Sequence, residues 1–146
     1  MRERRAAREL ALQAMYASEL SGDPIQHVAA SVIDTSEISP ELKDFARKLF
    51  QTSSLHKSEL DEYIKKKSEN WDFERIAVLD RLIIRMAICE FLHFEDIPPK
   101  VSISEAIEIA KKFSTSDSSA FVNGILDAVL HLISDKLANT SDSTKE

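Results

Sequence analysis

Glycine, proline and cysteine are scarce in this chain, which has two glycines, four prolines and one cysteine among its 146 residues. So few turn-forming residues argue against a fold of many short strands joined by tight turns. A single cysteine excludes an intramolecular disulfide, and the N-terminal stretch is not an apolar signal segment, so we expect a reducing, cytoplasmic setting. The chain is long enough to bury a core without metal or disulfides.

Positively charged residues are also few, because the chain has 19 lysines and arginines and 25 aspartates and glutamates, which gives a net charge of -6. This balance argues against non-specific binding of nucleic acid, which depends on cations. Gly22 and Gly124 stand alone, so no glycine-rich loop can hold a phosphate. Cys89 and His93 lie close together on one expected helix, but two ligands do not form a zinc site. We therefore predict no catalytic residue, no metal and no cofactor.

An apolar stretch, WDFERIAVLDRLIIRMAICEFL, occupies residues 71–92. Asp72 suits the N-cap position and Trp71 can pack on Ile76, so we expect a helix to begin there. Apolar residues on nearly every side predict a buried helix at the centre of a bundle. The charged residues within the stretch exclude a membrane span.

Those charged residues need partners, because an unpaired buried charge is costly. We interpret Arg85 and Glu90 as members of structural ion pairs. Asp80 has Ile76 and Ile84 as its helical neighbours. A charge surrounded by apolar surface is typical of an interface, so Asp80 is a candidate for contact with a basic partner.

Helical periodicity recurs on both sides of this stretch. It predicts helices over residues 2–20, 25–33, 40–67 (one helix or two abutting ones), 102–113 and 121–137. Ser39 and Pro40 suit an N-cap and a first helical residue, and Ser102 with Glu105 fits a capping box. Gly124 within the last helix predicts close approach of another helix or of a ligand. We expect an all-α, compact single domain over residues 1–137 and a disordered polar tail over 138–146.

Two groups of side chains could hold single-stranded RNA, which needs cations for its phosphates and flat rings for its bases. The first group is Arg2, Arg4, Arg5 and Arg8; the second is Lys111, Lys112, Phe113 and Phe121, on either side of a polar turn. Charge runs are often only solvated faces, and core packing explains phenylalanines simply. The pattern alone leaves both interpretations open.

Four segments, in this order and spacing, resemble signatures of the NusB family of transcription antitermination factors. They are residues 4–16 (RRAARELALQAMY), 80–90 (DRLIIRMAICE), 97–106 (IPPKVSISEA) and 121–127 (FVNGILD). The resemblance covers about residues 2–130. It departs from the common pattern at Cys89, where an aromatic residue is frequent, and at Ser104, where asparagine is frequent; both are packing or capping positions.

The resemblance implies a bundle of about seven helices in two packed sub-bundles and no catalysis. Members of the family bind the boxA element of nascent RNA, most tightly as a heterodimer with NusE, a ribosomal protein of the small subunit. The pair joins other Nus factors on RNA polymerase and counters premature termination, notably on ribosomal RNA operons. Some members form homodimers when free, so the oligomeric state of this chain stays open.

The resemblance also implies roles for individual residues. The RNA-contact set is Arg2, Arg4, Arg5, Arg8, Gln13, Lys111, Phe113, Asp117 and Phe121, and the NusE-contact set is Tyr16, Glu74 and Asp80. Within the first set the arginines would take phosphates, the rings would contact bases, and Asp117 would weaken binding by repulsion. Because the chain is acidic overall, we expect it to bind RNA weakly when alone, with a strong salt dependence.

Two other functions fit the same residues. A similar domain precedes the catalytic domain of certain ribosomal RNA cytosine methyltransferases, so the chain could be an RNA-binding accessory domain. It could instead be a helical adaptor that binds only proteins, with its arginines merely solvated. Titration with a short boxA-like RNA, with and without NusE, separates RNA binding from the adaptor function.

Overall fold

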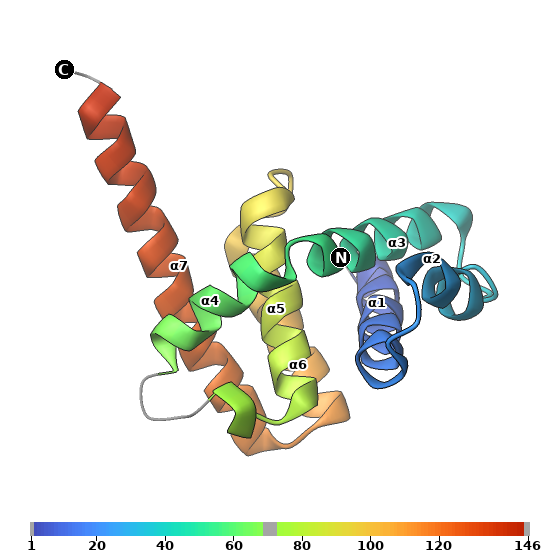
Figure 1. Cartoon of the computed structure of the whole chain (residues 1–146). Helices are drawn as coiled ribbons and strands as arrows, with labels where there is room; N and C mark the ends of the chain where they lie inside the picture. The colour runs from blue at the N-terminus through green and yellow to red at the C-terminus, as the bar shows by residue number, and fades with distance from the viewer. Residues whose placement is uncertain (1, 69–72, 145–146) are drawn as a thin grey trace.

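Helices form all the regular structure of the described part of the computed structural model, which covers the backbone of residues 2–68 and 73–144. Side chains are described for residues 4–68, 73–115 and 117–136. The elements are α1 (Arg2–Ser21), α2 (Ile25–Val28), the π-helix η1 (Ala29–Ile33), α3 (Pro40–Leu55), α4 (Lys57–Lys67), the 3₁₀ turn η2 (Phe73–Arg75), α5 (Val78–His93), α6 (Pro99–Phe113) and α7 (Ser116–Thr144) (Figure 1). The predicted all-α fold is confirmed.

The helices form two groups that meet along α5. The first group is α1, α2, η1 and α3, and the second is α4 to α7 (Figure 1). The most extensive packing joins α1 to α3 and α6 to α7, while α5 contacts both α1 and α3 across the boundary. This arrangement confirms the two packed sub-bundles that the family resemblance implies.

Several helix ends lie where local sequence places them. The Ser39 hydroxyl accepts a hydrogen bond from the Leu42 backbone N–H at 3.3 Å, and Pro40 opens α3, as the N-cap prediction requires. Gly22 follows α1 with φ of 70°, a left-handed conformation that favours glycine. The predicted helix over residues 40–67 is two helices, which meet at His56.

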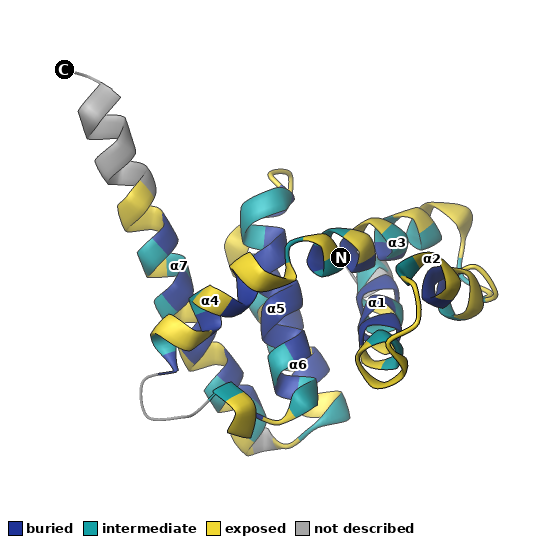
Figure 2. Ribbon diagram, viewed as in Figure 1, coloured by how far each residue is buried: buried dark blue, intermediate teal, exposed yellow. Residues whose placement is uncertain are grey.

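The central helix begins later than its apolar pattern predicts. Helix α5 starts at Val78 with Ala77 at its N-cap, after the separate turn η2, so the expected start at Asp72 is wrong. Trp71 and Asp72 themselves lie outside the described residues. The expected burial is confirmed, because every residue from 82 to 90 is buried (Figure 2).

The predicted capping box at residues 102–105 is also wrong, because α6 begins at Pro99 with Pro98 at its N-cap. Ser102 and Glu105 are buried instead and contact charged residues of other helices. Gly124 is exposed, and a Cβ atom added there would meet nothing within 4 Å, so the expected close approach of another helix is absent from the described structure.

The last helix is longer than its apolar stripe. The backbone of residues 138–144 continues α7, while the side chains of residues 137–146 lie outside the described set. The division into a domain of residues 1–137 and a disordered tail therefore stays a prediction. Within the described residues, every helix is too short or too polar to cross a lipid bilayer.

Candidate nucleic-acid and partner interface

The predicted phosphate contact Arg8 lies inside the protein. Only 1% of its surface is exposed, and its Nε and Nη2 donate to the two carboxylate oxygens of Glu90 at 2.8 and 2.9 Å. The Ser102 hydroxyl donates to the same carboxylate at 2.8 Å, so the network joins α1, α5 and α6. An exposed phosphate contact at Arg8 is therefore contradicted, because the guanidinium is enclosed and its charge is already matched. The expectation that Glu90 forms a structural ion pair is confirmed.

Arg85 also forms a structural ion pair, as the sequence predicts. Its Nε and Nη2 donate to the carboxylate oxygens of Asp61 on α4 at 2.7 and 3.0 Å, and both residues are buried. This pair ties α5 to α4 as the Arg8 network ties α5 to α1. Breaking a buried pair on one side leaves the other charge stranded, so both pairs favour a single arrangement of the helices.

Helices α1 and α6 lie side by side and form a ridge of charged residues. Arg5 donates to Glu105 at 2.5 Å, and further along both helices Lys112 pairs with Glu9 at 2.8 Å. The order of the two contacts shows that the helices run in the same direction. We call Arg4, Arg5, Lys111 and Lys112 the α1–α6 ridge.

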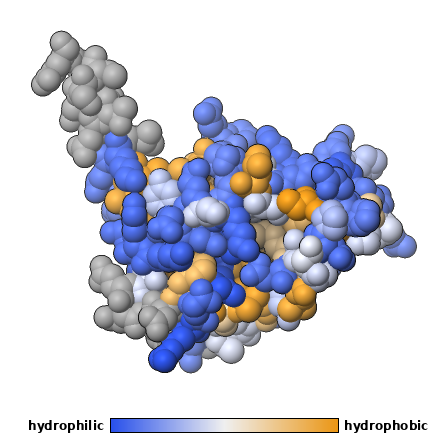
Figure 3. Space-filling view, in the orientation of Figure 1, coloured by the Kyte–Doolittle hydropathy of each residue, from blue (hydrophilic) through white to orange (hydrophobic). Residues whose placement is uncertain are grey.

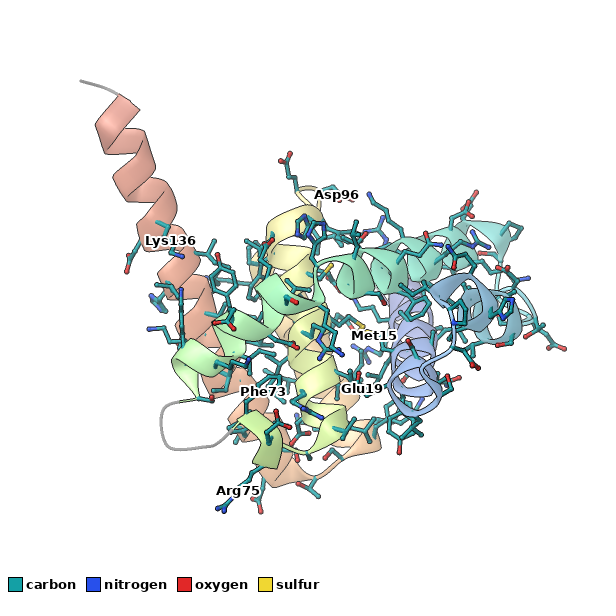
Figure 4. The ribbon with its side chains drawn as sticks, viewed as in Figure 1. Met15, Glu19, Phe73, Arg75, Asp96 and Lys136 are labelled. Atoms are coloured by element: carbon teal, nitrogen blue, oxygen red, sulfur yellow. The ribbon has the colours of Figure 1, made fainter. Side chains whose placement is uncertain are left out.

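Arg4 extends this ridge toward the loop after α5. Its guanidinium lies 3.7 Å from the Asp96 carboxylate and 4.7 Å from the centre of the Phe45 ring. Figure 4 shows Asp96 at one end of α5 and Arg75 at the other. Arg4 and Arg75 therefore lie toward opposite ends of α5.

Every cation of the α1–α6 ridge has a carboxylate partner. Besides the three pairs above, Lys111 lies 3.5 Å from Glu108. The hydrogen bond to Glu105 raises the pKa of the Arg5 guanidinium above its ordinary value. Because RNA phosphates must compete with these carboxylates, the ridge alone provides only weak electrostatic attraction.

The two predicted stacking rings lie beyond the end of the ridge. Phe113 is the last residue of α6, about 12 Å along the helix axis from Glu105 at 1.5 Å per residue. The Lys112 ammonium lies 5.4 Å from the centre of the Phe113 ring. Phe113 and Phe121 both pack against the core on one side and remain partly exposed.

A short polar turn places Phe121 in the first part of α7. The Thr115 hydroxyl accepts a hydrogen bond from the Ser118 backbone N–H at 3.0 Å, in the manner of an N-cap. The helix therefore begins at Ser116, inside the segment for which the sequence predicts a turn. Asp117 is exposed in its first turn.

A pocket of about 310 Å³ lies where the start of α5 meets the start of α7. Its lining consists of Arg75, Ile76, Ala77, Asp80, Asp117, Ser118 and Phe121. Asp80 is only 6% exposed, and its Oδ1 atom has no hydrogen-bond partner among the described residues. The pocket thus joins Asp117 and Phe121, predicted to face RNA, to Asp80, predicted to face a protein partner. Figure 3 shows hydrophobic residues on the lower part of the drawn face and further patches of them higher on the same face.

The remaining predicted residues lie on α1, which carries part of the α1–α6 ridge, and on η2, which borders the pocket. Gln13 is exposed on α1, one turn beyond Glu9, and Tyr16 is 40% exposed further along the same helix. Glu74 is exposed on η2, beside a residue that lines the pocket. Arg2 belongs to α1, but its side chain lies outside the described residues.

Sequence reasoning missed some residues of this surface. Arg75 and Ser118 line the pocket, and Glu105 holds Arg5, yet none was predicted to take part. Arg75 precedes α5 in a turn, so helical periodicity carries no signal for its position. Glu105 could have been found, because a carboxylate on the inner side of a helix needs a cationic partner.

Comparison with known proteins connects these features to one family. The family model described as the NusB family matches residues 5–131. The transcription antitermination protein NusB of Salinibacter ruber is 47% identical over 131 residues, which cover 89% of this chain and 82% of that protein. A crystal structure of the antitermination factors NusB and NusE in complex with dsRNA has a TM-score of 0.80 at 25% identity, covering 88% of this chain and 96% of the matched chain. NusB of T. maritima has a TM-score of 0.79 at 34% identity, with coverage of 86% and 89%.

Proposed function

This chain belongs to the NusB family, and we propose that it is a transcription antitermination factor that binds boxA RNA together with NusE. In this function the pair joins the other Nus factors on RNA polymerase, notably on ribosomal RNA operons. The chain acts by binding and not by catalysis, and the bacterial cytoplasm is where nascent RNA would meet it. Its family membership and the similar structure of NusB and NusE with dsRNA support the proposal.

The α1–α6 ridge supports the RNA part of the proposal. Arg4, Arg5 and Lys111 would exchange their carboxylate partners for phosphates, and the ring of Phe113 lies directly beyond them. The single observation that carries this part is the pair of contacts from Arg5 to Glu105 and from Lys112 to Glu9, which aligns the N-terminal arginines with that ring. Because each cation gives up an existing ion pair, RNA binding by the chain alone should be weak.

The pocket around Asp80 supports the NusE part. A carboxylate that is 94% buried, with one oxygen that accepts no hydrogen bond from the described residues, favours a partner group that brings an N–H or a positive charge. Ile76, Ala77 and Phe121 supply an apolar lining for the rest of such a side chain. Asp117 and Phe121 belong to the same lining, so bound NusE would lie next to the RNA path and extend it with its own cations.

The experiment that tests the proposal is a fluorescence-anisotropy titration with a short boxA RNA, with and without NusE, at two salt concentrations. Lys111→Glu should lower the affinity of the pair for RNA by about tenfold at low salt, because it replaces a phosphate contact by a repulsion. Lys66→Glu is the matched control, since Lys66 is also exposed in the last turn of its helix, α4. Equal affinities of the two variants would remove the ridge from the RNA site, and undetectable RNA binding even with NusE would favour a protein-only adaptor.

A further inference from the structure

A cluster of two histidines and a glutamate contains no residue of the proposed RNA and NusE surfaces. His56 occupies the junction between α3 and α4, Glu59 follows in the first turn of α4, and His93 ends α5. The Glu59 carboxylate lies 3.7 Å from His56 Nδ1 and 3.9 Å from His93 Nε2. One donor atom from each residue lies within 4.8 Å of the other two. Sequence spacing did not reveal this cluster, because His93 meets the other two residues only in the folded chain.

The His93 ring provides a second observation that points to a ligand. Its Nε2 atom is buried and has no hydrogen-bond partner among the described residues. The His56 and His93 rings stack with centroids 4.1 Å apart and planes 20° apart. Burial lowers the pKa of His93, and the nearby His56 lowers it further. A neutral imidazole keeps a lone pair free, which is the form that binds metal ions.

We propose that His56, Glu59 and His93 bind a divalent transition-metal ion of the zinc type, with water as the fourth ligand. Two imidazole nitrogens and one carboxylate oxygen suit Zn²⁺, whereas Mg²⁺ and Ca²⁺ prefer sites made of oxygen alone. With metal–ligand bonds of about 2.0–2.2 Å, tetrahedral ligand atoms lie roughly 3.4 Å apart. The distances from Glu59 Oε2 to His56 Nδ1 and from Glu59 Oε1 to His93 Nε2, 3.7 and 3.9 Å, are longer than that value, so the three side chains must close in on the ion.

Metal binding requires only local side-chain motion. The lone pair of an imidazole lies in the ring plane, so the two rings must tilt out of their stack to point at one ion. His56 is 33% exposed, Glu59 is 50% exposed and His93 is 27% exposed at the side chain, which leaves room for this motion and for entry of the ion. Cys89, one turn earlier on α5, is not a ligand in this proposal, because its thiol is not among the donor atoms that lie within 4.8 Å of one another.

The bound ion would connect the junction of α3 and α4 to the end of α5. His56 is the single residue between the two helices, so the metal would hold the corner at which α4 departs from α3 (Figure 1). An ion that binds the folded state and not the unfolded state raises the thermal midpoint of unfolding. This consequence does not depend on RNA binding, so the two proposals can fail separately.

The test is a titration of the metal-free full chain with ZnCl₂, by calorimetry and by competition with a chromophoric chelator. We expect one ion per chain, a rise of a few degrees in Tm, and a visible absorption band from tetrahedral Co²⁺ when cobalt replaces zinc. His56→Gln and Glu59→Gln change partly exposed positions, so they should fold normally, and each should weaken Zn²⁺ binding by at least about tenfold. His93→Gln should do the same.

The other two histidines of the chain supply the matched control. His27 and His131 lie on α2 and α7, outside the cluster, and the double variant His27→Gln, His131→Gln should bind Zn²⁺ as the unchanged protein does. The proposal is overturned if Zn²⁺ does not bind at micromolar concentrations. It is equally overturned if binding survives in His56→Gln and Glu59→Gln but is lost in the control.

Discussion

Arg8 and Glu90 form a bidentate ion pair that is almost completely shielded from solvent, with distances of 2.8 and 2.9 Å between their paired atoms. The pair joins the N-terminal helix to the central helix, and Ser102 adds a third helix to the same carboxylate. Arginine spacing along α1 suggests an exposed cationic edge, but Arg8 is buried in the core.

Replacing Arg8 by methionine should therefore destabilise the protein strongly. Removal of one partner from a buried pair costs about 3–5 kcal/mol, because the remaining carboxylate has no cation. Urea denaturation followed by circular dichroism measures the change. Arg4→Met is the control, since the Arg4 pair with Asp96 is exposed and 3.7 Å long, and it should cost about 0.5 kcal/mol or less. Similar costs for the two variants would contradict the assignment of Arg8 to the core.

Asp80→Lys should weaken the association with NusE by more than about 1 kcal/mol, because it places like charge against a basic surface. Isothermal titration calorimetry measures the affinity, and circular dichroism verifies that the variant still folds. Glu95→Lys provides the charge-matched control, because Glu95 is exposed in the loop at the opposite end of α5. If both variants bind NusE equally well, the pocket is not the partner site.

Asp117→Asn should tighten RNA binding by about threefold, since it removes an exposed negative charge beside the path of the phosphates. The gain should shrink as salt is added, because an exposed charge is screened. Anisotropy titrations at two ionic strengths test both statements. Asp127→Asn alters an exposed acid further along α7 and should change the affinity little. Weaker RNA binding by Asp117→Asn would show that Asp117 does not lie beside the path of the phosphates.

Gly124→Ala should raise the free energy of unfolding by about 0.5–1 kcal/mol, because the added methyl group meets nothing and alanine favours the helix. Gly22→Ala should have the opposite effect, since Gly22 has φ of 70°. Chemical denaturation of both variants tests the pair of statements. A stabilised Gly124→Ala that binds NusE or RNA less well would show that the glycine serves a close approach in the complex.

The Cys89 thiol should resist alkylation in the native protein. Burial raises its pKa to about 11, so at pH 8 the thiolate that reacts with iodoacetamide is nearly absent. The same cysteine should react readily in urea, where its pKa returns to the ordinary range. Mass spectrometry after short exposures gives both rates, and rapid native labelling would refute the buried position.

Much of the fold could be predicted from local sequence, because hydrophobic periodicity and capping residues indicate where helices lie. Ser39 and Pro40 mark the start of α3, and the glycine after α1 marks its end. The start of α5 escaped prediction because apolar residues continue from Ile76 into the helix, while the backbone first forms a separate turn. An apolar pattern shows that residues are buried without showing which hydrogen bonds their backbone makes.

The candidate site was harder to predict than the fold, because its properties depend on pairs distant in sequence. The partner of Arg8 is Glu90, and that of Arg5 is Glu105, so arginine spacing alone could not separate the buried side chain from the accessible one. The exposure of Phe113 and Phe121 likewise depends on how α6 and α7 meet. The cluster of His56 with His93 was missed for the same reason.

The anchoring of α1 through Arg8 has a kinetic consequence for assembly. Arg4 and Arg5 precede this anchor by four and three residues, about one turn of a continuous helix, so the buried pair at Arg8 limits fraying of their backbone. The surface that binds RNA would therefore be ordered before the RNA arrives, and binding would not require a disordered segment to fold. Capture of RNA should accordingly be limited by diffusion and by exchange of counter-charges, with little refolding of the protein.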